Sequence, residues 1–142
     1  MRGLILVAAV AGVAIAPLSA RPAEAKVDYD RLLDAIAKVE SDRGATSANV
    51  YQLRRIYVRD VNRIKGWSVR YADAIRDPAL AKQCILAYWR HYARGYERRT
   101  GRKATAETLA RMHNGGPDGW REAATTRYWR RVSRVYKGGG RK

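Results

Sequence analysis

The sequence has 142 residues, which is enough for one compact domain and too few for two of ordinary size. Lysine and arginine together number 29 against 13 aspartate and glutamate residues, so the net charge is +16. Such a surface attracts polyanions, and the excess of arginine over lysine favours forked hydrogen bonds to carboxylates or phosphates. The single cysteine excludes an intramolecular disulfide, so packing has to stabilise the fold.

Residues 1–25 have the features of a secretory signal peptide, with Arg2 as the basic start and an apolar run at residues 4–16. This run is shorter than the roughly 20 residues that span a bilayer, which makes a membrane anchor the weaker interpretation. We therefore expect a secreted or periplasmic protein without stable membrane insertion after signal removal. Its expected parts are a domain at residues 26–137 and a disordered basic tail at residues 138–142.

The first helix is predicted by apolar residues that recur at three- and four-residue intervals over residues 32–39. It should begin after Asp28 or Asp30 and end near Ser41. Glu40 falls on the same apolar stripe, where a carboxyl group is rarely buried without a partner and tends to keep its proton. Glu40 is therefore a candidate general acid, unless the helix has already ended there and the side chain is solvated.

Helical periodicity continues along the chain, and no alternating strand pattern of useful length occurs. The fold class is therefore all-α, or α+β at most if residues 42–49 form a minimal hairpin. An arginine at every fourth position would give the long helix a cationic ridge, either solvated or able to dock an anionic partner: Arg90, Arg94, Arg98 and Arg102. Further helices are predicted at about residues 50–64, 71–75, 78–100, 105–112 and 120–136.

Most of the acidic residues lie at predicted helix starts, in a turn or beside basic neighbours, which leaves Glu40 and Asp42 without a structural role. Two carboxyl groups at a helix end that faces an aromatic-lined groove suggest glycoside hydrolysis, with one protonated and the other ionised. Residues two apart on a helix do not face each other. The pair therefore requires the helix to break at Ser41, which Gly44 favours.

Three blocks of the sequence resemble the invertebrate-type (destabilase) lysozymes. The first block has Glu-Ser at Glu40, Asp-x-Gly-x-x-Ser from Asp42 to Ser47, and Tyr-Gln at Tyr51 with a later Tyr57. The second reads Ala-Arg-Met-His-Asn-Gly-Gly-Pro-Asp-Gly over residues 110–119, where the family has Ala-Arg-Ile-His-Asn-Gly-Gly-Pro-x-Gly. The third matches the family's Tyr-Trp-x-x-Val ending at Tyr128, Trp129 and Val132. The same blocks are similar, more loosely, to lytic transglycosylases.

The resemblance implies a lysozyme-like helical domain with a groove between the Glu40 helix end and the His113 loop. It implies cleavage of β-1,4 glycosidic bonds in peptidoglycan, with Glu40 as general acid and Asp42 as the second carboxylate. The family separates its two carboxylates by about ten residues that include β structure and cysteines, whereas here they are two apart. The residues that match positions near the sugar are Ser47, Tyr51, Gln52, Tyr57, His113, Asn114 and Gly115.

Structural roles are open for the same residues. His113 could hold the glycine-rich turn, Gln52 could serve as a helix cap, and Tyr51 and Tyr57 could belong to the core.

Other functions also remain open at this point. A lytic transglycosylase needs Glu40 alone, and a non-catalytic cationic protein could bind cell walls or membranes on the same fold. Nucleic-acid binding is disfavoured by the signal peptide and by the lack of a recognised motif. We expect no cofactor and no metal ion, a monomer, and peptidoglycan or a related anionic cell-wall glycan as the partner.

Overall fold

The computed structural model describes residues 26–138, so the predicted signal peptide and residues 139–142 lie outside the described part. This part contains helices and turns but no strand, which confirms the all-α prediction and excludes a hairpin at residues 42–49. None of its helices is long and apolar enough to cross a bilayer. The elements are α1 (Tyr29–Ser41), α2 (Arg55–Lys65), α3 (Tyr71–Arg76), α4 (Pro78–Thr100), α5 (Ala106–Gly115), the 3-10 helix η1 (Gly119–Arg121) and α6 (Ala124–Gly138).

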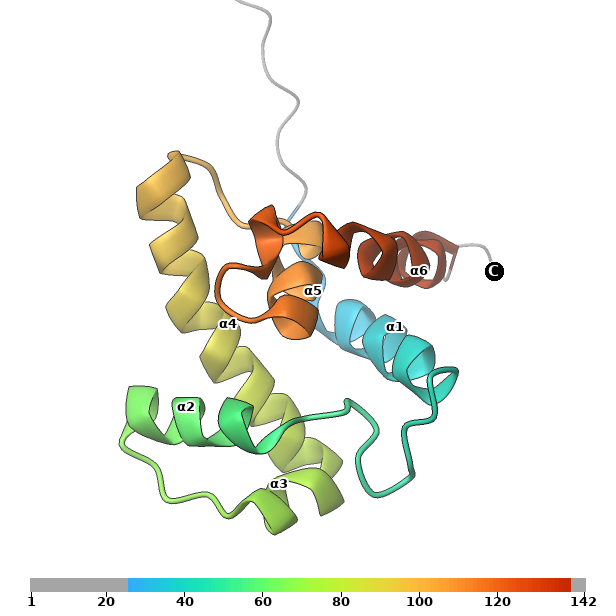
Figure 1. Ribbon diagram of the computed structural model, residues 1–142, viewed down its shortest axis with the longest axis vertical. Helices are drawn as coiled ribbons and strands as arrows, with labels where there is room; N and C mark the ends of the chain where they lie inside the picture. Colours follow the sequence, from blue (N-terminus) through green and yellow to red (C-terminus); the bar gives the residue numbers. More distant parts are fainter. Residues whose placement is uncertain (1–25, 139–142) are drawn as a thin grey trace, which may run out of the picture.

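Helix α4 is the long central element, with α2 and α3 beside its first half and α5 farther along it (Figure 1). The Asp77 carboxylate caps its start by accepting hydrogen bonds from the backbone of Ala79 and Leu80, and Pro78 occupies the first turn. Gly101, at φ +67°, ends the helix in the left-handed conformation. These are the signals that predicted α4 from the sequence, with the same bounds.

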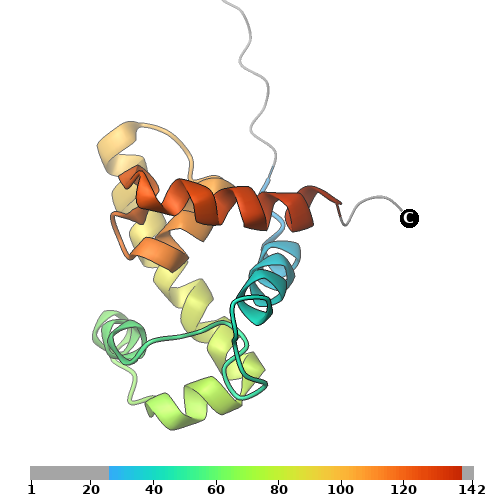
Figure 2. The same ribbon diagram turned by 45° about the vertical axis from the view of Figure 1, so that its right-hand side comes forward.

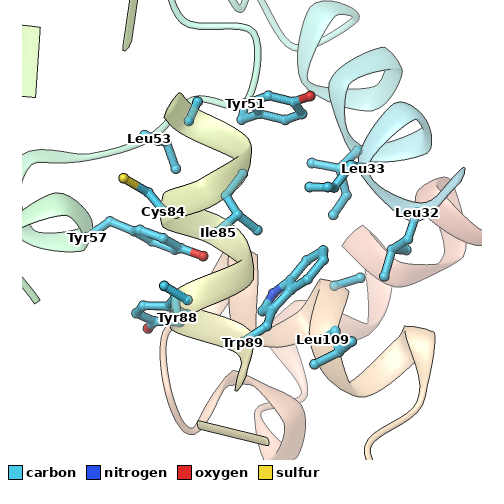
Figure 3. Packing of buried hydrophobic residues seen from close by; sticks show 14 of the residues in the cluster. Leu32, Leu33, Tyr51, Leu53, Tyr57, Cys84, Ile85, Tyr88, Trp89 and Leu109 are labelled. Carbon is cyan, nitrogen blue, oxygen red and sulfur yellow. The ribbon is translucent and has the colours of Figure 1, made fainter. Parts of the chain in front are cut away.

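The core lies on both sides of α4. Figure 3 shows Tyr57 of α2 beside Cys84 and Tyr88, whereas Leu109 of α5 lies nearer Trp89. The Tyr57 and Tyr88 rings stack with their centroids 4.0 Å apart. Cys84, the single cysteine, is fully buried.

Helix α1 buries the predicted apolar stripe, with Leu32, Leu33 and Ile36 fully inaccessible to solvent. Asp28 caps its start by accepting a hydrogen bond from Arg31 N at 3.0 Å. The helix packs against α5 and α6, and the two views show α6 next to it and at an angle to it (Figures 1 and 2). The end of α1 is thereby fixed next to residues from late in the chain.

The second helix begins at Arg55 instead of near residue 50 because the preceding segment is held in a turn. The Asn49 side chain accepts a hydrogen bond from Leu53 N at 2.9 Å and donates one to Leu53 O at 3.0 Å. Gln52 adopts φ +49°, which an α-helix cannot contain. These contacts hold residues 49–53 in a turn, which forms the bridge segment from α1 to α2.

The two C-terminal helices also differ from their predicted bounds. Helix α5 continues through Gly115, so His113 lies in its last turn rather than in a loop, and Gly116 at φ +85° together with Pro117 stops it. The last predicted helix is interrupted, because η1 ends at Arg121 and α6 begins at Ala124. Helix α6 extends to Gly138, which is one residue into the expected tail.

Candidate active site

Glu40 lies in the last turn of α1, and only 3 % of its surface is exposed. The chain turns back directly after it, since Arg43 N and Ala45 N both donate hydrogen bonds to Glu40 O, at 3.0 and 2.9 Å. The apolar stripe that faces the core carries the side chain inward. The prediction that a carboxyl group occupies a core-facing position is confirmed.

The Glu40 carboxyl group has few polar contacts. Oε1 lies 3.6 Å from Arg43 Nη1, and Oε2 has no hydrogen-bond partner within residues 26–138. Burial raises the pKa of Glu40, whereas the Tyr128 hydroxyl, Arg43 and Arg131 each lower it. The net effect is a raised pKa, so this carboxyl group retains its proton at a higher pH than an ordinary glutamate.

The hydroxyl of Tyr128 on α6 lies close enough to Glu40 to lower the pKa of that carboxyl group. It forms no hydrogen bond of ordinary geometry with any residue of the described part. Burial and the adjacent carboxylate raise the pKa of Tyr128, so the group stays a neutral phenol. The Arg43 guanidinium lies over its ring, 5.5 Å from the centroid. Glu40, Arg43 and Tyr128 therefore form one compact group where α1 meets α6.

A cavity of about 250 Å³ opens beside this group. Two larger cavities adjoin it, because each shares two lining residues with it. Arg54 and His113 are shared with a mostly apolar cavity of about 540 Å³, which Tyr57 and Tyr88 also line. Arg43 and Asn114 are shared with a polar cavity of about 370 Å³ against α6. Glu40 therefore faces the middle of three adjoining cavities, an arrangement suited to an extended chain. The lining residues of the central cavity are Glu40, Arg43, Gln52, Arg54, His113 and Asn114.

His113 joins α5 to the bridge segment, because its Nε2 lies 3.0 Å from Tyr51 O. Burial lowers the pKa of His113 to about 4, so the ring is neutral at physiological pH. A carbonyl oxygen can only accept, which assigns the proton to Nε2 and leaves Nδ1 as an acceptor. Nδ1 is buried and has no partner among the described residues.

Asp42 does not lie with Glu40. Its side chain is 59 % exposed, and its Oδ1 is 3.5 Å from Lys38 Nζ on the preceding turn of α1. It lines none of the three adjoining cavities. The helix breaks where predicted, but the break turns Asp42 toward solvent, so a catalytic role for Asp42 stays a prediction.

The remaining predicted residues fall into two groups. Gln52, Tyr57, His113 and Asn114 line the adjoining cavities. Gln52 also donates from Nε2 to the carbonyl oxygens of Glu40 and Arg43, at 3.3 and 3.4 Å, and so caps α1.

The second group lies outside the cavities. Ser47 is exposed in the loop, and Tyr51 is buried in the core, where Figure 3 shows its ring between the start of α4 and α1. Gly115 has no room for a side chain, since a Cβ atom would lie 2.6 Å from Thr125 Cγ2. Its part is to let α5 approach the start of α6.

Arg43, Arg54, Tyr128 and Arg131 are functional candidates that the sequence did not indicate as site residues. Arg43 follows Glu40 by three positions, which on a helical turn would place the two side chains together. Nothing in the spacing of Tyr128 or Arg131 predicts that α6 lies against the end of α1.

The fold and the site together define a class of protein. It is a lysozyme-like helical domain in which a buried acid faces a row of cavities. A solved structure of Meretrix lusoria lysozyme in complex with Aeromonas hydrophila PliI matches with a TM-score of 0.59 and 28 % identity. The match covers 74 % of this chain and 88 % of that one. No protein-family model matches the sequence.

Curated relatives identify the family. The Meretrix lusoria lysozyme is 30 % identical over 115 residues, which cover 74 % of this chain and 88 % of that protein. Invertebrate-type lysozyme 6 of Caenorhabditis elegans is 34 % identical over 93 residues, 62 % of this chain and 66 % of that protein. Lysozyme 1 of Crassostrea virginica is 35 % identical over 91 residues, 64 % of this chain, and the chain spans only 46 % of its length. The chain belongs to the invertebrate-type lysozyme family.

Proposed function

We propose that this protein is a lysozyme-type glycoside hydrolase that cleaves peptidoglycan strands with Glu40 as the general acid. The observation that carries the proposal is the buried Glu40 carboxyl group, which has an unpartnered oxygen and faces the central cavity. A general acid needs a proton at the working pH and access to the leaving oxygen. Burial supplies the first and the cavity supplies the second.

In the proposed reaction, a glycan strand occupies the adjoining cavities and Glu40 protonates the glycosidic oxygen between two sugars. The bond to the leaving oxygen breaks, and the oxocarbenium-like centre is captured by water or stabilised by a carboxylate. Arg43 and the Tyr128 hydroxyl lower the pKa of Glu40, so they stabilise the carboxylate that remains after proton transfer. His113 lines the same cavity, and its hydrogen bond to Tyr51 O holds α5 against the bridge segment there.

A lytic transglycosylase that uses Glu40 alone is the second candidate, and the position of Asp42 favours it. That carboxylate is exposed, paired with Lys38 and outside the cavities. Without a second carboxylate, the sugar's own hydroxyl can capture the reactive centre and leave an anhydro product. Mass spectrometry separates the two reactions, because hydrolysis adds one water to the products and transglycosylation adds none.

Replacing Glu40 with glutamine tests the assignment. The Glu40→Gln protein should fold, as checked by circular dichroism, and should clear cell-wall suspensions about 10²- to 10⁴-fold more slowly. Asp42→Asn is the companion variant, and a near-normal rate for it would leave Glu40 as the only required carboxyl group. Lysis that persists in Glu40→Gln would exclude this acid. Salt-sensitive wall binding without product release would instead identify a non-catalytic cationic binder.

Export to the periplasm or the cell exterior completes the proposal, because peptidoglycan lies there. The signal-like segment at residues 1–25 supports it. Expression with and without residues 1–25, followed by cell fractionation, measures whether that segment directs export.

A further inference from the structure

The polar cavity of about 370 Å³ beside Glu40 is lined by three arginines and by no acidic residue. Arg43 comes from the loop after α1, and Arg127 and Arg131 lie one turn apart on α6. Arg43 is paired with Glu40, whereas Arg127 and Arg131 form no ion pair within residues 26–138. Asn114 at the end of α5 completes the polar lining.

This arrangement is electrostatically unfavourable in the empty protein. Like charges four residues apart on a helix repel, by roughly 0.2–0.5 kcal/mol per pair, and the third guanidinium adds to the repulsion. The start of α6 at Ala124 also lines the cavity, so the positive end of the helix dipole reaches the same space. An oxyanion bound here would relieve both effects.

The chemistry of the three side chains defines the ligand. Guanidinium groups bind carboxylates through paired, charge-assisted hydrogen bonds, whereas neutral sugar hydroxyls gain little from several cations. The cavity shares Arg43 and Asn114 with the Glu40 cavity, so a group bound in it belongs to a sugar close to the bond that is cleaved. In peptidoglycan every second sugar carries a carboxylate on its lactyl or peptidyl side arm.

We propose that the cavity formed by Arg43, Arg127 and Arg131 is a subsite for the carboxylate of the muramyl side arm. This inference rests on the proposed function, because it assumes that a glycan strand occupies the adjoining Glu40 cavity. The subsite sets the register of the strand and selects carboxylate-bearing glycans over neutral ones. In this subsite the arginines contact the side arm and not the cleaved bond, and Arg43 and Arg131 also lower the pKa of Glu40.

The test uses two oligosaccharides of equal length, one of alternating N-acetylglucosamine and N-acetylmuramic acid and one of N-acetylglucosamine alone. The measured quantity is the ratio of kcat/KM for the carboxylate-bearing substrate to kcat/KM for the neutral one, at constant ionic strength. The double variant Arg127→Gln/Arg131→Gln should lower this ratio about tenfold, as expected for loss of hydrogen bonds to a charged group. Because both substrates meet the same free protein, a change in the pKa of Glu40 in the free protein affects both kcat/KM values equally and cancels in the ratio.

The matched control is Arg130→Gln/Arg134→Gln, which removes two exposed arginines with the same spacing on the same helix but outside the cavity. It should leave the ratio unchanged. An equal fall in the kcat/KM ratio in both double variants would overturn the proposal. The preference for the carboxylate-bearing substrate would then come from the positive charge of the whole protein surface. Loss of binding to anionic phospholipid vesicles in Arg127→Gln/Arg131→Gln, with the ratio unchanged, would overturn it in favour of a membrane surface.

Calorimetry on the Glu40→Gln protein separates this proposal from the proposed function. Tighter binding of the carboxylate-bearing oligosaccharide, lost in the Arg127→Gln/Arg131→Gln background, supports the subsite even if the wild-type protein cleaves neither substrate. Equal affinity for the two oligosaccharides overturns the subsite even if cleavage is observed. Absence of cleavage by the wild-type protein counts against the proposed function alone.

Discussion

Replacing Arg43 with glutamine should move the alkaline limit of the proposed hydrolase activity to higher pH. In the proposed mechanism the active protein carries a proton on Glu40, so the rate falls as pH rises through the pKa of Glu40. Arg43 stabilises the carboxylate and lowers that pKa. Removing the guanidinium favours the protonated acid, and the falling limb of the profile therefore moves upward in pH.

The distance of 3.6 Å between Arg43 Nη1 and Glu40 Oε1 determines the size of the effect. Two unit charges at this separation attract by about 1 kcal/mol at the dielectric constant of water, and by several times more in a protein interior. The Arg43 side chain is 38 % exposed, so solvent screening places the interaction near the lower value. About 1 kcal/mol corresponds to about a fivefold change in proton affinity, and hence to an up to about fivefold higher relative rate beyond the wild-type limb.

The assay measures initial rates of glycan cleavage from acidic to alkaline pH, with each profile normalised to its own maximum. Arg130→Gln is the control, because it removes one exposed arginine of α6 that lines no cavity near Glu40. Higher salt should move the wild-type limb in the same direction and the Arg43→Gln limb less, since screening weakens the same interaction. A limb that stays in place, or moves to lower pH, in Arg43→Gln would refute Glu40 as the titrating acid.

The remaining predictions concern stability. Burial lowers the pKa of His113 from 6.5 to about 4, so the contribution of the neutral ring to the free energy of unfolding is full above pH 6.5 and is lost as pH falls toward 4. Urea titrations should show that the free energy of unfolding falls by about 3 kcal/mol over this range, and His113→Asn should remove this pH dependence. Burial raises the pKa of Glu40 above 4.5, so the contribution of the protonated acid to the free energy of unfolding is full below pH 4.5 and is lost as pH rises through the raised pKa. The Glu40→Gln protein should not show this loss of stability. Gly119→Ala would place a Cβ atom 2.2 Å from Arg111 O and should lower the free energy of unfolding by about 1–3 kcal/mol. In Gly95→Ala the nearest neighbouring atom would be 4.0 Å from the new Cβ atom, so this substitution should raise the free energy of unfolding by about 0.5–1 kcal/mol. Similar effects of the two substitutions would contradict the close approach of Gly119 to the Arg111 carbonyl.

The helices whose limits are encoded locally were predictable from the sequence. Asp77, Pro78 and Gly101 define both ends of α4, and the apolar stripe of α1 places Glu40 in the core. The start of α2 was not predictable, because apolar periodicity begins before the helix does. In the structure, the two hydrogen bonds between the Asn49 side chain and the Leu53 backbone hold this segment in a turn despite that periodicity.

Two of the electrostatic partners of Glu40, Tyr128 and Arg131, depend on tertiary packing, which single-sequence patterns do not report. Tyr128 and Arg131 reach the acid because α6 packs against α1, and no local spacing encodes that contact. Asp42 illustrates the opposite case, since its position in the sequence suggests a pair with Glu40. The turn after Ser41 directs its side chain to solvent and Lys38.

Retention of a proton by Glu40 in so basic a protein requires effects that outweigh the positive field. Burial is the largest, and the location of Glu40 in the last turn of α1 adds the negative end of a helix dipole, which also disfavours a carboxylate. A substrate carboxylate bound between Arg127 and Arg131 would cancel part of the opposing field from Arg131 and Arg43. The pKa of Glu40 would then be higher in the substrate complex than in the free protein, so the alkaline limb of kcat would lie at higher pH than that of kcat/KM. Recognition of the anionic side arm and protonation of the acid would in this way be coupled, and a neutral glycan would lack both advantages.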